Sequence, residues 1–98
     1  MAGVDPRRYE LRTAVARLRR ELALLSYELP DRAVADDELA ALDAMVREGL
    51  PEVPRLRRSL LLIAGAVGSV SALSPALADV RAGVERFGGP PGAPLRRR

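Results

Sequence analysis

Hydrophobic residues recur along this chain at alternating spacings of four and three, the period of an amphipathic α-helix. The clearest run follows Asp5 and Pro6, which suit a helix N-cap and a first turn, and it stops before Pro30. The pattern therefore predicts a helix over residues 6–29. The positions of its seam, which we expect to pack against another helix or form an interface, are Leu11, Val15, Leu18, Leu22, Leu25 and Leu29.

This heptad-like seam suits either a homodimeric coiled coil or a bundle within one chain. In a parallel dimer, the flanking positions would pair Ala14 with Arg19 and Glu21 with Ser26. Neither pair is an ion pair, although flanking ion pairs commonly specify coiled-coil partners. Packing within the chain is therefore the favoured interpretation.

Three further helices are predicted, over residues 32–48, 55–73 and 75–87. Gly49 suits the stop of the second, and Ser74 followed by a proline suits the start of the last. The third is apolar on nearly all sides, as expected of a helix central in a bundle or in a membrane. No strand-like alternation is present, so we predict an all-α fold, a small three- or four-helix bundle.

The chain has 98 residues, enough for one domain. We expect a single helical domain over residues 1–88 and a flexible, disordered Gly/Pro/Arg tail over residues 89–98. Tyr9, Tyr27 and Phe87 are the whole aromatic supply, so the core must be built from leucine, valine and alanine.

Residues 59–78 contain no charged side chain and are long enough to span a bilayer. Arg57 and Arg58 precede this segment, as a cytoplasmic flank or a twin-arginine export signal would require. Its internal position argues against export, and Ser74-Pro75 would break a spanning helix. We therefore expect a cytoplasmic protein, with a membrane-associated or single-span protein as the alternative.

Two pairs of residues are candidates for contact with another helix or with a partner protein. Gly65 and Gly68 interrupt a helical pattern, where glycine costs about 1 kcal/mol relative to alanine. They predict a close approach of another backbone, from the first helix or a second subunit. Tyr9 and Tyr27 are five helical turns apart and so share one face of the predicted first helix. They are either a second contact face for a partner or two half-exposed surface tyrosines.

The composition excludes several kinds of chemistry. The chain has no cysteine and no histidine, which removes zinc fingers, disulfides, thiol nucleophiles and histidine bases. Acidic residues between Asp31 and Glu38 lack the spacing of a calcium loop, and helix capping explains them better. We therefore expect no catalytic residue, no metal site and no cofactor, and thus not an enzyme.

All sixteen basic residues are arginine, and the net charge is +3. The guanidinium group of arginine is well shaped to bind phosphate, but a GC-rich coding bias also explains why arginine is used here in place of lysine. Glutamates interrupt the arginines of the first helix, and aromatic residues that could stack on bases are scarce. No specific nucleic-acid partner is therefore expected.

The segment from Leu56 to Arg81, which contains Leu-Leu-Leu-Ile-Ala-Gly-Ala-Val-Gly, resembles part of small uncharacterised actinobacterial helical proteins. It is also similar in style to helical effector-associated modules of bacterial conflict systems. The resemblance implies an interaction module of unknown partner. Together with the surplus apolar helical surface, it predicts a non-enzymatic protein-interaction or scaffold module that forms homo-oligomers or binds another helical protein.

Overall fold

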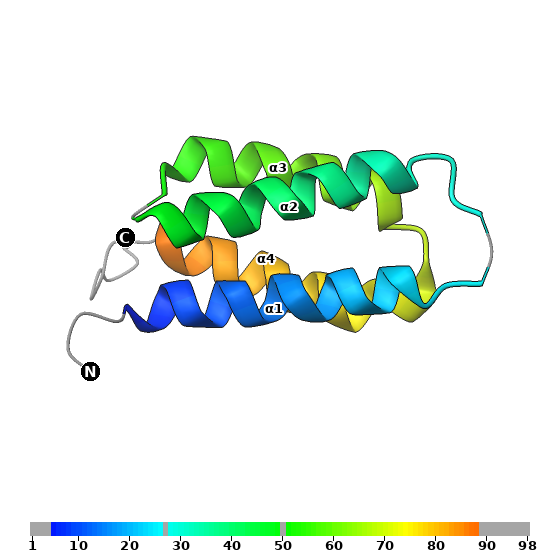
Figure 1. Ribbon diagram of the computed structural model, residues 1–98, viewed down its shortest axis with the longest axis horizontal. Coiled ribbons are helices and arrows are strands. Elements are labelled where there is room, and N and C mark those ends of the chain that lie inside the picture. The colour runs from blue at the N-terminus through cyan, green and yellow to red at the C-terminus, as the bar shows by residue number, and fades with distance from the viewer. Residues whose placement is uncertain (1–4, 27, 50, 89–98) are drawn as a thin grey trace, which may run out of the picture.

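The computed structural model describes residues 5–26, 28–49 and 51–88, which form an antiparallel four-helix bundle (Figure 1). The helices are α1 (Pro6–Ala23), α2 (Arg32–Glu48), α3 (Val53–Val67) and α4 (Ser74–Gly88), and the 3₁₀ turn η1 (Ser71–Leu73) precedes α4. Each helix packs against two others in the cyclic order α1, α2, α3, α4. No strand occurs in these residues. The prediction of an all-α bundle is confirmed, with four helices.

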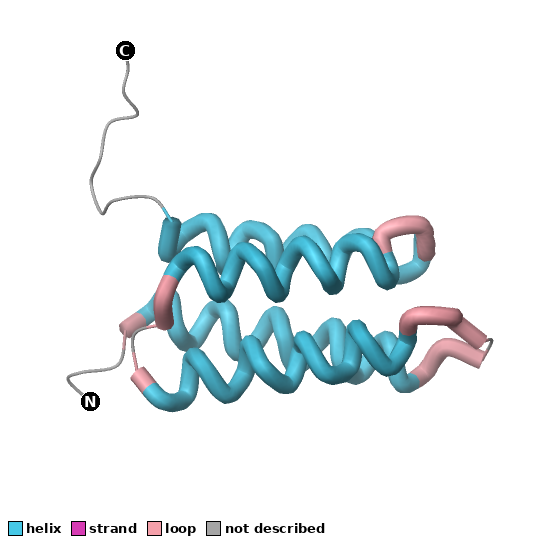
Figure 2. The backbone as a smooth tube through the Cα atoms, turned by 90° about the horizontal axis from the view of Figure 1, so that it is seen from above, coloured by secondary structure: helices cyan, strands magenta, loops and turns pink. Residues whose placement is uncertain are grey.

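The four helices form two layers. Figure 2 looks onto the layer of α2 and α3, and α1 and α4 make the opposite side of the bundle. The connections from α1 to α2 and from α3 to α4 lie at one end, and the connection from α2 to α3 lies at the other (Figure 1). Every pair of packed neighbours is therefore antiparallel.

The core consists of the inward positions of the four helices together with Val70 and Leu73 of the last connection. As expected, leucine and valine dominate it, and Phe87 is the aromatic residue that it contains. Full burial of such side chains contributes about 1.5–3 kcal/mol each. Ser59, 5% exposed, is the buried polar residue of the described chain, and its hydroxyl donates to Glu38 Oε1 over 2.8 Å.

The prediction that the first helix extends to residue 29 is wrong, because α1 ends at Ala23. Its 18 residues nearly match the 17 of α2, whereas a continuation to residue 29 would add about 9 Å beyond the bundle. Leu25 and Leu29 instead pack against the core from the loop. Burial of these two leucines thus favours the turn over further helix.

The predicted helix over residues 55–73 also ends early, at Val67. The Gly68 N–H donates to the Ala64 carbonyl over 2.8 Å and closes the last turn. The chain then reverses so that Val70 and Leu73 cover the end of the core. A straight helix would have carried both side chains past the bundle.

Of the other boundaries, the start of α3 at Val53 lies two residues before the predicted one, and the remaining boundaries agree with the sequence. The predicted helices over 32–48 and 75–87 correspond to α2 and, within one residue at each end, α4. Gly49 follows α2 with a φ of 145°, a conformation that side-chain-bearing residues rarely adopt. The predicted tail, residues 89–98, lies outside the described residues.

The uncharged segment over residues 59–78 is divided among α3, a turn, η1 and the start of α4. Within the described ranges, no helix has both the length and the apolar character needed to cross a bilayer. Ile63, Val67 and Val70 of this segment are buried in the protein core.

Candidate interaction surfaces

The leucine seam is covered within the chain. Leu11, Val15, Leu18 and Leu22 are buried, and their neighbours come from the other helices of the same bundle. The last two seam positions pack against this core from the loop and are half-buried. These side chains are thus engaged in the fold, and an interface must come from other surfaces.

Tyr9 lies on the outward side of α1 and is 66% exposed. Tyr27 lies outside the described residues. Because α1 ends at Ala23, the helical spacing that put the two tyrosines on one face does not continue to residue 27. The half of the prediction that concerns Tyr27 thus falls outside the described residues, and Tyr9 is an exposed residue of this side of α1.

Among the described residues, no other backbone comes close to Gly65, where a close approach was predicted. A Cβ atom at Gly65 would meet nothing within 4 Å, and at Gly68 it would meet only the carbonyl of its own helix. The close approach instead occurs at Gly83 of α4, where a Cβ atom would lie 3.3 Å from Leu11 Cα. Gly83 follows Val80 by three residues and so lies on the buried side of α4. This spacing is the sequence feature that could have indicated the close approach.

α3 is not the central helix that its composition predicted. It packs against α2 and α4, and its remaining surface faces outward. On that surface Leu61 is 73% exposed and Leu62 39% exposed. Arg58 and Gly65 are exposed on the same helix. Spacings of three, four and seven residues join Arg58, Leu61 and Gly65 into one outward stripe. This apolar stripe with an arginine at one end is the most hydrophobic exposed feature of α3.

The two helices of the α2–α3 layer carry opposite net charge. α2 contains five acidic residues and two arginines, whereas α3 contains three arginines and no acidic residue. On α2 the exposed positions include Asp37, Ala40, Ala44 and Glu48. The layer thus presents an acidic, alanine-rich strip beside a basic, leucine-bearing one.

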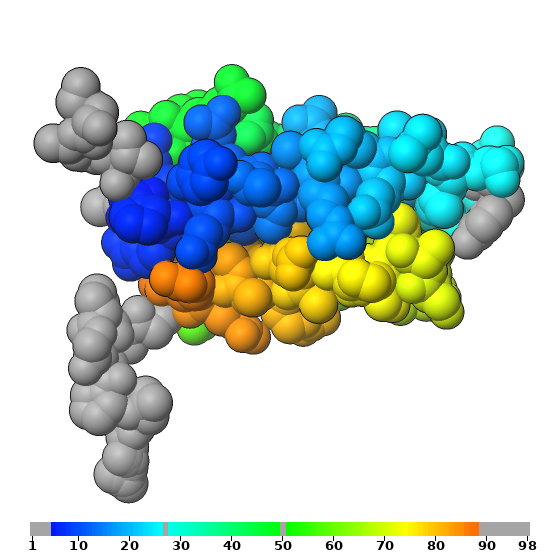
Figure 3. Space-filling model, turned by 90° about the horizontal axis from the view of Figure 1, so that it is seen from below, coloured from blue at the N-terminus to red at the C-terminus, as the bar shows by residue number. Residues whose placement is uncertain are grey.

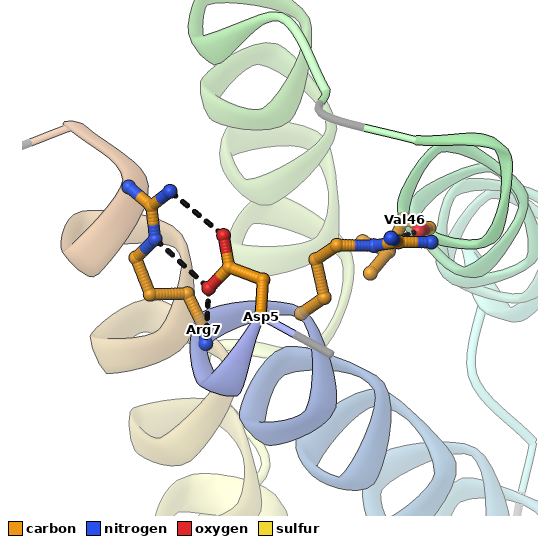
Figure 4. Close-up of polar contacts among 4 residues, drawn as sticks. Asp5, Arg7 and Val46 are labelled. Atoms are coloured by element: carbon orange, nitrogen blue, oxygen red, sulfur yellow. Dashed lines mark hydrogen bonds and ion pairs between the residues drawn. The ribbon is translucent and has the colours of Figure 1, made fainter. Parts of the chain in front are cut away.

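Arginine side chains from neighbouring helices cap the C-terminal ends of two helices. Arg8 of α1 donates from Nε to the Val46 carbonyl over 2.8 Å, drawn in Figure 4, and from Nη2 to the Arg47 carbonyl over 3.1 Å. Arg32 of α2 donates to the Leu22 carbonyl over 2.6 Å. The last carbonyls of a helix lack partners within it and carry partial negative charge, so guanidinium groups stabilise these ends.

The start of α1 is closed by Asp5, as the sequence predicts. Its carboxylate accepts from the Arg7 backbone N–H over 2.9 Å and from Arg7 Nη2 over 2.8 Å (Figure 4). The side-chain and then the backbone hydrogen bonds from Arg7 hold the pKa of Asp5 below its ordinary value of 3.8. The same guanidinium lies 4.8 Å from the centroid of the Phe87 ring and so joins α1 to α4.

Two surface grooves flank the exposed side of α1. One, of about 320 Å³, lies toward α2, and the other, of about 330 Å³, lies toward α4. Both reach Tyr9 and Thr13, which therefore form a ridge between them. Figure 3 shows the face on which α1 and α4 lie side by side. Within the described ranges, no group of three or more acidic side chains is arranged to hold a metal ion.

A family model described as "Family of unknown function (DUF5955)" matches residues 1–88. The chain belongs to this family. The match reaches well beyond the resemblance over residues 56–81 and includes all four helices. Comparison with curated proteins and with solved structures finds no match.

For this family member, the residues that sequence reasoning missed are those whose role depends on neighbours distant along the chain. Gly83 meets α1, Arg8 meets the end of α2, and Ser59 meets Glu38. Each is unremarkable in its own helix. The sequence indicated a third helix that is apolar on nearly all sides, but it did not indicate that Leu61 and Leu62 are the exposed leucines of that helix.

Proposed function

We propose that this protein is a non-enzymatic helical interaction module that self-associates through the α2–α3 layer. The observation that supports the proposal is the exposed pair Leu61 and Leu62 on a layer whose two helices carry opposite charge. Leucines exposed in this way lower the free energy when a second surface covers them, by roughly 25 cal/mol per Å².

A second copy of the chain is the occupant that the charges favour. A two-fold axis parallel to the helices would set α3 of one copy against α2 of the other. The arginines at the start of α3 would then face Glu48 at the end of α2 of the partner copy, because α2 and α3 are antiparallel. The small side chains of Ala40 and Ala44 would allow Leu61 to approach closely. One interface would thereby cover the apolar stripes of both copies. By symmetry, the basic end of α3 would meet the acidic end of the partner's α2 at two places.

The size of the layer limits the affinity. Two helices of 15 to 17 residues offer a face of about 24 by 20 Å, or roughly 500 Å² per copy. This is at the low end for specific interfaces, so we expect a reversible dimer with a dissociation constant in the micromolar range.

Sedimentation velocity over a range of concentrations tests the proposal. We expect wild-type protein to shift from monomer to dimer, and Leu61→Glu to remain monomeric. Leu24→Glu is the matched control, since Leu24 is even more exposed but lies at the end of α1, outside the layer. A wild-type chain that stays monomeric at high micromolar concentration, or equal loss in both variants, would refute the interface.

A second candidate follows from the same stripe. Leucines beside Arg58 also suit the headgroup region of an anionic membrane, which attracts arginine and accepts apolar side chains. Flotation with phosphatidylserine vesicles distinguishes the two: co-flotation of a chain that stays monomeric without lipid favours the membrane. We propose the cytoplasm as the compartment, and cell fractionation of the native protein tests it.

A further inference from the structure

The outward side of α1 has features of a second binding surface, independent of the proposed self-association. It lies away from the outward stripe of α3, and it carries the exposed Tyr9 together with the groove toward α2. Tyrosine and arginine are among the residues enriched in protein interfaces and in their hot spots. The groove is lined by both, with Thr13 and Ala16 between them.

The groove toward α2 has an excess of positive charge. Arg12, Arg19 and Arg47 line it, and Asp43 is its acidic lining residue. The Asp43 carboxylate lies 2.7 Å from Arg47 Nε and 3.8 Å from Arg12 Nε, so two guanidinium groups share one acid. Arg19 has no ion pair or hydrogen bond with any residue that the structure describes. Two positive charges of this groove are therefore left without compensation.

The groove toward α4 differs, because its charges are matched. Arg17 Nη1 lies 2.7 Å from an Asp79 oxygen and its Nε 2.9 Å from Glu21, whose hydrogen bond raises the Arg17 pKa. Arg86 pairs with Glu10 over 3.1 Å. The contrast between the two sides of α1 shows that the positive excess is confined to the side facing α2.

The spacing of the arginines indicates the shape of the occupant. Arg12 and Arg19 are seven residues apart on α1, which is two turns or about 10.5 Å. Carboxylates at the same seven-residue spacing on another helix would meet both guanidinium groups, which bind carboxylates in a forked geometry. Ala16 lies between them and leaves room for the partner helix to approach. A nucleic acid would find Tyr9 as the single aromatic side chain of this groove.

We propose that the α1 groove lined by Arg12 and Arg19 binds an acidic amphipathic helix of a partner protein. Carboxylates two turns apart pair with the arginines, and an apolar residue between them packs on Ala16 beside Tyr9. The proposal goes beyond self-association. In a dimer formed through the α2–α3 layers, one such groove remains open on each copy.

Fluorescence anisotropy with a designed probe tests this binding. The probe is a labelled alanine-based helical peptide of about 16 residues whose glutamates are spaced two turns apart on one face. The control peptide has the same composition with its glutamates spread around the helix. We expect the full-length chain to bind the first peptide more tightly, and the binding to weaken as salt is added.

Two double variants identify the site. Arg12→Gln with Arg19→Gln should weaken peptide binding about tenfold, since each exposed ion pair contributes roughly a two- to fivefold factor. Arg20→Gln with Arg81→Gln removes the same charge from exposed positions outside the groove and outside the α2–α3 layer, and should change binding by less than about twofold. Equal loss in both variants, or equal binding of the two peptides, would overturn the proposal.

The remaining outcomes separate this site from its competitors. Tighter binding of a single-stranded oligonucleotide with the same charge as the peptide would assign the groove to nucleic acid instead. Loss of self-association in the Arg12→Gln, Arg19→Gln variant would assign it to a second copy of the chain. Retained peptide binding by monomeric Leu61→Glu supports the groove whatever the fate of the proposed dimer, and its loss would contradict an independent site.

Discussion

Gly65 and Gly83 are both glycines inside helices, but their surroundings predict opposite effects of the same substitution. At Gly65, a Cβ atom would meet nothing within 4 Å. At Gly83, it would lie 3.1 Å from Leu11 Cδ1 and 3.3 Å from Leu11 Cα. The side-chain atom can move, but the Cα atom belongs to the backbone of α1. Alanine at Gly83 therefore requires α1 and α4 to separate by a few tenths of an ångström.

The magnitudes follow from these contacts. Gly→Ala inside a helix gains about 1 kcal/mol in helix propensity, so Gly65→Ala should stabilise the chain by about that amount. Gly83→Ala gains the same propensity but pays an overpacking cost of about 1–3 kcal/mol. We expect a net loss of about 1 kcal/mol there, and thus a difference of about 2 kcal/mol between the two variants. For a domain of this size, each kcal/mol shifts Tm by about 4–8 °C.

Urea unfolding followed by circular dichroism measures the difference. Both substitutions are made in the Leu61→Glu background, so that self-association does not contribute. Gly83→Val serves as a graded control, because its larger side chain should cost more than alanine at the same contact. If Gly83→Ala were as stable as Gly65→Ala, the inferred close packing of α4 on Leu11 would be wrong.

Three further substitutions test the polar contacts that join the helices. Arg8→Ala should lower the free energy of unfolding by about 1 kcal/mol, because the last carbonyls of α2 lose a charged donor. In the same urea unfolding assay, the control Arg20→Ala, at an exposed position, should stay within about 0.5 kcal/mol of wild type. Ser59→Ala should cost about 1 kcal/mol by removing a buried donor to an α2 carboxylate, and a neutral result would show that this bond contributes nothing. Asp5→Asn keeps a capping oxygen but loses the charge. Because the folded pKa of Asp5 is lowered, its charge stabilises the fold above pH 3.8, and this stabilisation is lost as the pH falls through the folded pKa. The Tm difference from wild type should therefore shrink at acid pH, and a constant difference would exclude the charge as its cause.

Local patterns predicted most of the secondary structure. The seam from Leu11 to Leu22, the proline and aspartate at the start of α1, and Gly49 after α2 all act within a few residues of chain. They depend on helix periodicity and on backbone conformation, which a sequence displays directly. The all-α class and the boundaries of α2 followed from them.

The errors in the sequence analysis have one cause. Leu25 and Leu29 continue the heptad spacing, and nothing nearby in the chain reveals that the bundle ends before them. Val70 and Leu73 likewise continue the apolar run of α3. In each case the core has a finite length, and a turn buries the side chains where a longer helix would expose them. The lengths of the neighbouring helices thus decide where these two helices stop.

The candidate surfaces depended even more on tertiary structure. The sequence alone determined that the chain is helical, rich in aliphatic and arginine side chains, and without cysteine or histidine. It did not determine that Leu61 faces outward or that the close glycine is Gly83 and not Gly65. Nor did it determine that Arg12 and Arg19 line one groove, in which the single acidic residue, Asp43, is paired with Arg12 and Arg47. Helix periodicity fixes which residues share a face, but only the packing of four helices decides which faces remain exposed and which charges go uncompensated.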